Sequence, residues 1–150
     1  LTASYTDDGK GGTLPRLRGE QTIVLHSRKK KAALCDANRG MASVEQVEGE
    51  IGLIGRFPDG ASILFKDINL TGITRLTVRA GSFKPGEARF ELRKKTPQGE
   101  LLASIALPET GEGVFKEIPV QIDAGGLTDL CIVAKCGKDG EVGLNWIEFR

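Results

Sequence analysis

The sequence contains few of the residues from which catalytic sites are usually built. Its 150 residues include one histidine, His26, and three cysteines without CxxC spacing. A single histidine cannot supply a multi-histidine metal site and makes a Ser-His-Asp or Cys-His arrangement difficult to build. The phosphate-binding patterns GxxxxGK[ST] and GxGxxG do not occur either. These absences argue against nucleotide-dependent enzymes and the common nucleophilic hydrolases.

Carboxylates are the one kind of potential catalytic group that the sequence contains in quantity. The chain holds 20 aspartates and glutamates, enough in principle for the pair that hydrolyses glycosides. Most of them lie at outward positions of predicted strands or in turns, where solvation is the usual explanation. We therefore expect no enzymatic activity, and a small hydrolase is the least favoured hypothesis.

The chain also lacks a strong net charge and a long apolar run. Its formal charge is +1, so no overall field would draw in nucleic acid or an anionic membrane. No apolar run approaches the roughly 20 residues of a membrane helix. The basic run RKKK at 28–31 could contact an acidic partner, but a solvated face or the start of a strand is favoured. We expect neither nucleic acid nor a membrane as partner.

The three cysteines, Cys35, Cys131 and Cys136, leave two interpretations open. The favoured one is that they are small buried hydrophobic residues. The alternative is one disulfide and one free thiol in an exported protein.

Apolar and polar residues alternate over short segments between glycines. RLTVRAG places Leu76, Val78 and Ala80 on one face, and ARFELRKK and EIPVQID alternate in the same way. A period of two is typical of half-buried strands. Turn signals such as PDG and KPGE recur about every ten residues, which is typical of sandwiches and jelly rolls. We predict an all-β fold, a two-sheet antiparallel β-sandwich of the jelly-roll kind.

Two later segments refine this prediction. The uniformly apolar stretch LCIVAKC is typical of a central strand that is covered on both faces. The final segment, GLNWIEFR, alternates again and contains the only tryptophan. Period two puts Leu144 and Trp146 on one face and Asn145, Ile147 and Phe149 on the other, so we expect Trp146 to be structural.

The first 21 residues differ from the rest in composition. They read LTASYTDDGKGGTLPRLRGEQ and are rich in Gly, Thr and Asp. We predict a linker or an extended arm along an edge over residues 1–21, with Tyr5 pinning it to the core. Residues 22–150 are predicted to form a single sandwich domain.

Three stretches of the predicted sandwich carry an ordered set of motifs. They are DGASILFKDINLTGITRLTVRAGS, then ARFELRKKTPQGELLASIALPETGEGVFKEIPVQIDAGGLTDLCIVAK, then VGLNWIEF. In this order they resemble the family 6 type of carbohydrate-binding module, over roughly residues 22–150. The resemblance implies a jelly roll that binds a sugar in a cleft among loops at one end. It also implies a structural calcium near the first and last strands.

The segment YTDDGKGGTLPRLRGEQTIVLHS carries a second resemblance. It is similar to the connector before such modules in bacterial exported proteins that contain a quinoprotein sugar dehydrogenase or a c-type cytochrome. This implies an extracytoplasmic location, periplasmic or secreted, and a dehydrogenase or cytochrome domain as partner in the parent protein. The pattern CxxCH does not occur, so any haem would lie outside this chain.

The sequence departs from the family at the positions that matter for binding. The family's stacking tryptophan corresponds to Glu112 or Gly113, and its amide ligand corresponds to Gly143. A glutamate that helps to hold calcium corresponds to Ala33. Asn145 takes the position that faces the metal and is thus a metal candidate, although a hydrogen-bonded polar group is the favoured interpretation.

Other side chains could make the sugar contacts instead. Sugar binding needs a flat aromatic ring for stacking and polar groups that pair with hydroxyls. Phe83, with Lys84 beside it in GSFKPGE, is a candidate platform, although a Phe folded back over the sandwich end is favoured. Arg39 and Glu45 could pair hydroxyls, with solvated surface residues as the alternative. Glu112 completes the set of candidates.

We therefore predict a non-catalytic carbohydrate-binding accessory domain of a larger exported protein. It would bind a polysaccharide or oligosaccharide weakly and reversibly. The alternative is a structural or protein-interaction module that kept this fold and lost the sugar site.

Overall fold

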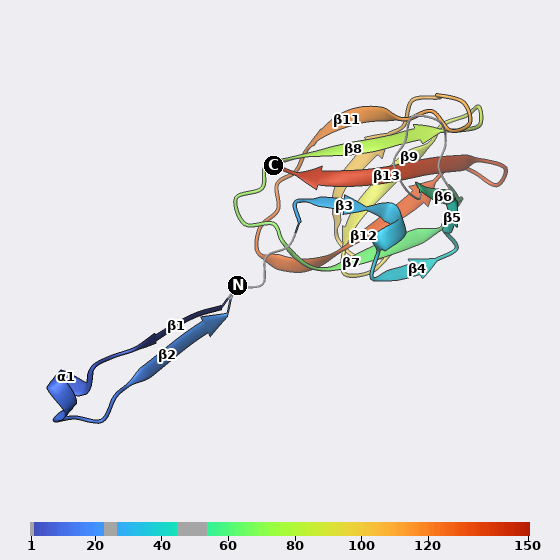
Figure 1. Ribbon diagram of the computed structural model, residues 1–150. Coiled ribbons are helices and arrows are strands. Elements are labelled where there is room, and N and C mark those ends of the chain that lie inside the picture. Colours follow the sequence, from blue (N-terminus) through green and yellow to red (C-terminus); the bar gives the residue numbers. More distant parts are fainter. Residues whose placement is uncertain (1, 23–26, 45–53) are drawn as a thin grey trace.

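The computed structural model describes residues 2–22, 27–44 and 54–150. It shows a two-layer sandwich of antiparallel strands and a separate N-terminal hairpin (Figure 1). The strands of the sandwich are β3 (Lys29–Lys31), β4 (Ala37–Arg39), β5 (Ala42–Val44), β6 (Ile54–Pro58), β7 (Ser62–Asn69), β8 (Arg75–Ser82), β9 (Arg89–Lys94), β10 (Leu101–Ala106), β11 (Lys116–Gln121), β12 (Leu127–Lys135) and β13 (Glu141–Phe149). A short 3-10 helix, η1 (Ala32–Leu34), follows β3. The predicted all-β, two-sheet antiparallel sandwich is confirmed.

Two sheets form the layers. One has the strand order β10-β9-β12-β7-β4, and the other has the order β11-β8-β13-β6-β5, with β3 also paired to β13. The stretch LCIVAKC lies in β12, between β9 and β7, so the predicted central strand is confirmed. The side chains between the layers include Phe57, Phe65 and Phe90, all essentially buried.

The alternation read from the sequence accounts for this core. Leu76, Val78 and Ala80 of β8 are at most 1% exposed, whereas Arg75 and Arg79 point away from the core. On β9, Phe90 and Leu92 are fully buried in the same way. Burial of each large apolar side chain contributes about 1.5–3 kcal/mol. Strands with this pattern are therefore stable only with one face against the other sheet.

Strand β13 departs from simple alternation. Its pairing with β8 shifts register between Leu144, opposite Ala80, and Trp146, opposite Arg79. This irregularity places Leu144, Ile147 and Phe149 in the core and Trp146 on the outer face. The prediction that Trp146 shares a face with Leu144 is wrong, because a bulge adds one residue to the strand and reverses the alternation after it.

Trp146 is nevertheless largely protected from solvent. It is 9% exposed, and the Nζ atom of Lys29 lies 3.8 Å from the centroid of its ring. Lys29 belongs to β3, whose residue Lys31 lies opposite Trp146. The edge strand and its lysines thus cover the tryptophan, which agrees with a structural role.

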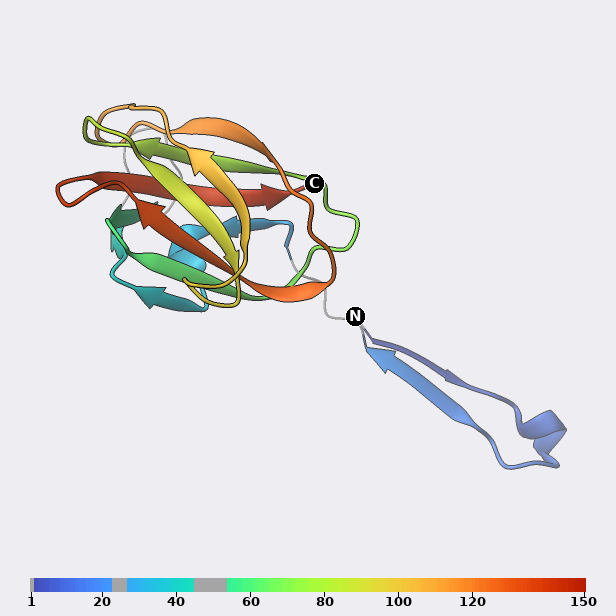
Figure 2. The ribbon, with the colours of Figure 1, turned by 180° about the vertical axis from the view of Figure 1, so that it is seen from behind.

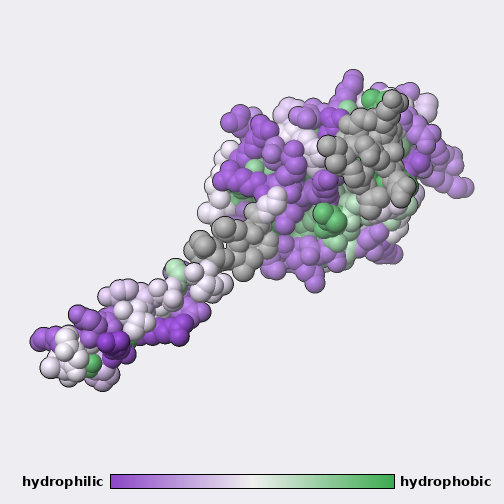
Figure 3. All heavy atoms as spheres, viewed as in Figure 1, coloured by the Kyte–Doolittle hydropathy of each residue, from purple (hydrophilic) through white to green (hydrophobic). Residues whose placement is uncertain are grey.

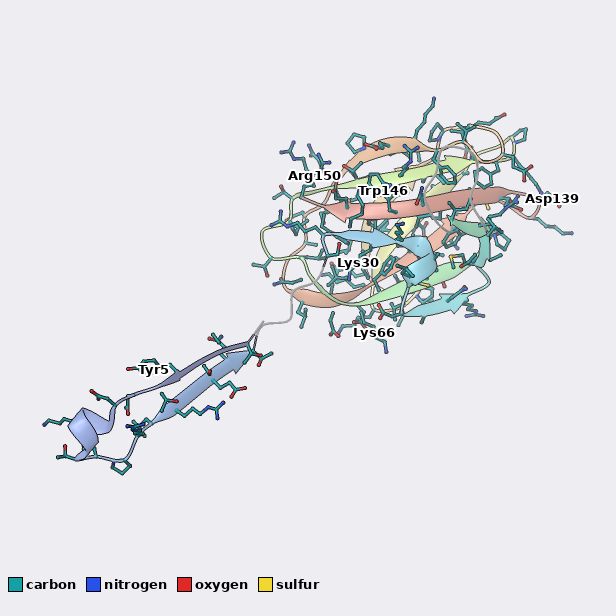
Figure 4. All side chains as sticks on the ribbon, in the orientation of Figure 1. Tyr5, Lys30, Lys66, Asp139, Trp146 and Arg150 are labelled. Carbon is teal, nitrogen blue, oxygen red and sulfur yellow. The ribbon has the colours of Figure 1, made fainter. Side chains whose placement is uncertain are left out.

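The N-terminal segment forms a hairpin. Strands β1 (Thr2–Thr6) and β2 (Arg18–Thr22) pair with each other, and a short turn of helix, α1 (Gly9–Gly12), lies between them. Figure 1 and Figure 2 show the hairpin standing apart from the sandwich. Tyr5 is 71% exposed (Figure 4), so it does not pin the segment to the core as expected. The division between residues 21 and 22 remains a prediction.

All three cysteines are free thiols, and the favoured interpretation of buried residues is confirmed for Cys131. Cys131 is buried, and Cys35 and Cys136 are half-buried. In the described part of the chain, no helix has the length and apolar character needed to cross a membrane.

Candidate functional site

Two phenylalanines and a glycine lie together at one end of the six-stranded sheet. Phe83 follows β8, where its N–H donates to the carbonyl of Glu141 over 2.9 Å. Its ring meets that of Phe115 edge to face, with centroids 5.6 Å apart and planes at 84°. A Cβ atom added to Gly143 would collide with the ring of Phe83 and lie 2.8 Å from Cε1 of Phe115. Position 143 is glycine because these rings cover it.

A charged group adjoins the two rings. Arg56 of β6 lies opposite Gly143 in the sheet, and its guanidinium carbon is 5.5 Å from the centroid of Phe83. The guanidinium contacts Glu112 at 3.1 Å, and its Nε donates to Oε1 of Glu141 over 2.5 Å. The hydrogen bond that Arg56 donates to Glu141 raises the pKa of Arg56, although burial opposes the shift. We call Arg56, Phe83, Glu112, Phe115 and Glu141 the loop-end cluster.

The loop after β10 carries Glu112 into this cluster. The Ser82 N–H donates to the carbonyl of Pro108, and the Thr110 N–H donates to the carbonyl of Ser82, both over 2.9 Å. The Thr110 hydroxyl also donates to the carbonyl of Val114 over 2.7 Å. The loop passes close over Gly81, where an added Cβ would lie 2.6 Å from the Val114 oxygen. This approach holds Glu112 within reach of Arg56 while leaving its side chain 74% exposed.

The loop-end cluster contains groups that suit sugar recognition. The ring of Phe83 is half-buried, so part of it remains open to solvent. An accessible ring can stack on the C–H face of a pyranose, and carboxylates and a guanidinium can accept from and donate to hydroxyls. Glycoside hydrolysis would instead need one carboxyl that stays protonated. Both glutamates here contact the guanidinium of Arg56, an arrangement that suits the binding of hydroxyl groups.

The structure brings some predicted site residues together and separates others. Phe83 and Glu112 both contact Arg56, and exposed Lys84 follows Phe83 in a turn held by a 2.8 Å hydrogen bond from the Ser82 hydroxyl to its carbonyl. Arg39 lies in β4 of the other sheet, so it does not share a site with Phe83. Glu45 lies outside the described residues.

Arg39 instead lines a groove on the five-stranded sheet. This groove has a volume of about 240 Å³, and Ser62, Cys131 and Lys95 contribute to its walls. Burial raises the pKa of Cys131 to about 11, although the charge of Arg93 and a hydrogen bond with Ser62 partly oppose the shift. The groove is therefore lined by a neutral thiol and bordered by two basic side chains.

Arg56, Phe115 and Glu141 are the residues of the loop-end cluster that the sequence did not indicate. Glu141 falls in a predicted turn, and Arg56 is 85 positions away from it along the chain. No local pattern links two residues at that separation.

No family model and no curated protein sequence matches the chain. Its fold is, however, similar to that of several solved structures. A β-1,3-glucan-binding family 6 carbohydrate-binding module from Bacillus halodurans superposes with a TM-score of 0.74 at 22% identity, covering 83% of this chain and 96% of that one. A family 6 module from Clostridium cellulolyticum in complex with xylose gives 0.74 at 20% identity, covering 83% and 99%. The chain has the fold of the family 6 carbohydrate-binding modules.

A third solved structure contains calcium, the metal that the resemblance implies. A family 36 carbohydrate-binding module in complex with calcium and xylotriose gives a TM-score of 0.62 at 15% identity, covering 81% of this chain and 98% of that one. In this chain Asn145 is 2% exposed within the bulged strand, and Ala33 stands in η1 where the resemblance implies a glutamate. The described residues include no group of three His, Cys, Asp or Glu that could hold a metal. The described residues at these positions therefore do not reproduce the carboxylate ligand that the resemblance implies.

Proposed function

We propose that the chain is a non-catalytic carbohydrate-binding module whose loop-end cluster takes the glycan. The observation that carries this proposal is the half-buried ring of Phe83 beside Arg56, whose guanidinium in turn contacts Glu112 and Glu141. Similar modules bind β-1,3-glucan and xylose. Those likenesses support a polysaccharide or oligosaccharide as ligand.

Each group in the cluster has a distinct part in the proposed contact. The ring of Phe83 stacks on a pyranose, Glu112 and Glu141 accept from hydroxyls, and Arg56 donates to a ring or hydroxyl oxygen. Lys84 adds a further donor at the rim. Because the cluster is shallow and solvated, ordering its side chains offsets much of the contact energy, and we expect weak binding.

The proposal extends to the setting of the module. We infer that it is an accessory domain of a larger exported protein in an extracytoplasmic compartment. The connector similar to those beside quinoprotein sugar dehydrogenases and c-type cytochromes supports a domain of one of these kinds as its neighbour in the parent protein. Such a neighbour would carry the chemistry, and the module would keep it near a polysaccharide.

A second candidate function rests on Phe83 itself. Its ring fills the space above Gly143, the position at which the resemblance implies an amide ligand. A ring in that place can equally be the cap of a sandwich that lost its sugar site. The chain would then be a structural or protein-interaction module on the same fold.

Affinity gel electrophoresis separates the two functions. We expect a gel containing xylan, hydroxyethylcellulose or a soluble β-1,3-glucan to retard the chain, and Phe83→Ala to abolish the retardation. Leu101→Ala is the matched control, because Leu101 is 47% exposed and lies on β10 of the other sheet. Equal retardation of the wild type and Phe83→Ala, or no retardation in any gel, would remove the support for this site.

A further inference from the structure

Basic side chains gather on the outer face of the six-stranded sheet, beyond the loop-end cluster. Trp146 lies opposite Arg79 on β8 and Lys31 on β3, and Arg79 lies opposite Glu117 on β11. Two residues further along, Glu148 lies opposite Lys29. Arg150 and Arg75 exchange backbone hydrogen bonds at the end of the strands. We call the five cations the basic face: Lys29, Lys31, Arg75, Arg79 and Arg150.

The basic face has a net charge that the whole chain does not. Among the described residues two acidic side chains also lie on this face: Glu117 pairs with Arg79 at 3.8 Å and Glu148 pairs with Arg150 at 2.7 Å. Five cations and two anions give these described side chains a sum of +3. The complete chain carries +1. Lys29, Arg75 and Arg150 are exposed (Figure 4 labels Arg150), and hydrophilic side chains gather over β3, β8 and β13 in Figure 3. A local positive field of this kind attracts polyanions even when the overall charge is near zero.

The basic face and the loop-end cluster lie on the same side of the sheet. Val142 and Leu144 belong to the core, so Gly143 between them points outward, as Trp146 does after the bulge. A chain bound across Phe83 could therefore continue along β13 toward Arg79 and Arg75. Neighbouring strands are about 4.8 Å apart, so the four strands β3, β13, β8 and β11 span about 14 Å.

We propose that the basic face binds an anionic polysaccharide, one that carries sulfate esters or carboxylates. The choice of a polysaccharide rests on the proposed function, whereas the attraction for anions rests on the basic face alone. Single-stranded nucleic acid fits less well, because its bases stack on accessible aromatic rings. Within the described part of the chain, the one aromatic ring on the basic face is that of Trp146, which is 9% exposed beneath the ammonium group of Lys29.

Trp146 offers a direct readout, since it is the only tryptophan in the chain. The loop-end cluster holds phenylalanines only, so tryptophan fluorescence reports on the basic face and is silent for the sugar site. We expect dextran sulfate to change the emission of Trp146 saturably at about 0.01 M ionic strength, and the change to vanish near 1 M, where the Debye length falls to about 3 Å. Uncharged dextran of the same length should leave the emission unchanged.

A substitution on the basic face tests whether dextran sulfate binds there. We expect Arg75→Ala to weaken dextran sulfate binding by roughly threefold to fivefold, the effect of one exposed charge. Arg18→Ala is the control, because it removes the same charge from the hairpin, where Arg18 is exposed. Equal responses to dextran and dextran sulfate, or equal weakening by both variants, would overturn the proposal.

Two further measurements test the choice of ligand and the independence of the two sites. Binding of poly(dT) as tight as that of dextran sulfate would overturn the choice of a polysaccharide. Phe83→Ala should leave the fluorescence response to dextran sulfate in place. Loss of neutral-glycan retardation with an intact response would thus distinguish the sugar site from the basic face.

Discussion

The phenyl ring of Phe83 occupies the space that a side chain at position 143 would need. Gly143 lies near the start of β13, between Arg56 of β6 and Gly81 of β8. Two strands thus present glycines side by side: the rings of Phe83 and Phe115 lie over Gly143, and Thr110 and Val114 lie over Gly81. An amide at position 143 and a ring folded over it are mutually exclusive.

Gly143→Ala tests this relationship. We expect a loss of about 1–3 kcal/mol in the free energy of unfolding, because the added methyl forces two rings to move. The loss should shrink in a Phe83→Ala background, where the methyl has room. Urea denaturation of the four variants, wild type, each single change and the pair, measures the coupling.

Gly125→Ala is the control for this series. A Cβ at Gly125 would have no heavy atom within 4 Å, so we expect a change within about 0.5 kcal/mol. If Gly143→Ala costs no more than this control, the ring of Phe83 is free to move aside. The space above position 143 could then hold the amide side chain that the resemblance implies there.

The strands that were predictable are those whose two faces differ. Leu76, Val78 and Ala80 alternate with polar residues because one face of β8 meets the core and the other meets solvent. The last strand was misread after Leu144, since the bulge there depends on its pairing with β8. A prediction based on alternation alone does not detect the extra residue that a bulge inserts into a strand.

The candidate site was predictable only in part. Phe83 and Glu112 were indicated by their position in turns, but the residue that joins them, Arg56, was not. Its contact with Glu141 joins strands 85 residues apart in sequence. Arg39 was predicted to pair hydroxyls of the same ligand, yet strand order places β4, which carries it, and β8, which precedes Phe83, on different sheets. Tertiary pairing decides these relationships, and one sequence does not display it.

The thiols should differ in reactivity. Burial raises the pKa of Cys131 to about 11, so its thiolate is scarce at neutral pH. We expect iodoacetamide at pH 7.5 to leave Cys131 unmodified in the folded chain and to modify it after unfolding in urea. Peptide mass spectrometry identifies the labelled residues. Labelling of folded Cys131 as fast as that of half-buried Cys35 would contradict the buried position.

The ammonium group above Trp146 should contribute to stability. We expect Lys29→Ala to cost roughly 0.5–1 kcal/mol, the value of a cation–π contact near the surface, and to shift tryptophan emission to the red as water reaches the ring. Lys66→Ala is the control, since Lys66 is an exposed lysine of β7 on the other sheet. An unchanged emission spectrum in Lys29→Ala would show that the lysine does not shield the ring.

Glu91 should make stability dependent on pH. It points outward from β9 yet is 7% exposed, because Arg89 and Arg93 lie on it at 3.3 Å and 2.9 Å. Burial alone pushes its pKa upward, but the hydrogen bonds and charges of Arg93 and Arg89 outweigh burial and leave the pKa lowered. A carboxyl with a lowered folded-state pKa stabilises the fold above its unfolded value of about 4.3, and this contribution is lost as the pH falls through the folded value.

We therefore expect Glu91→Gln to lower the free energy of unfolding by about 1–3 kcal/mol at pH 7, since the two guanidinium groups lose the negative charge and one of the two oxygens to which they donate. The difference in the free energy of unfolding between Glu91→Gln and the wild type should narrow as the pH falls below about 4. There the wild-type carboxyl takes up a proton and loses its charge. Urea denaturation at several pH values measures both effects. Glu100→Gln serves as control, because Glu100 is 66% exposed in its contact with Lys94, and such pairs contribute about 0–1 kcal/mol. A difference for Glu91→Gln that stays constant from pH 7 to pH 3 would mean that the charge of Glu91 does not stabilise the sheet.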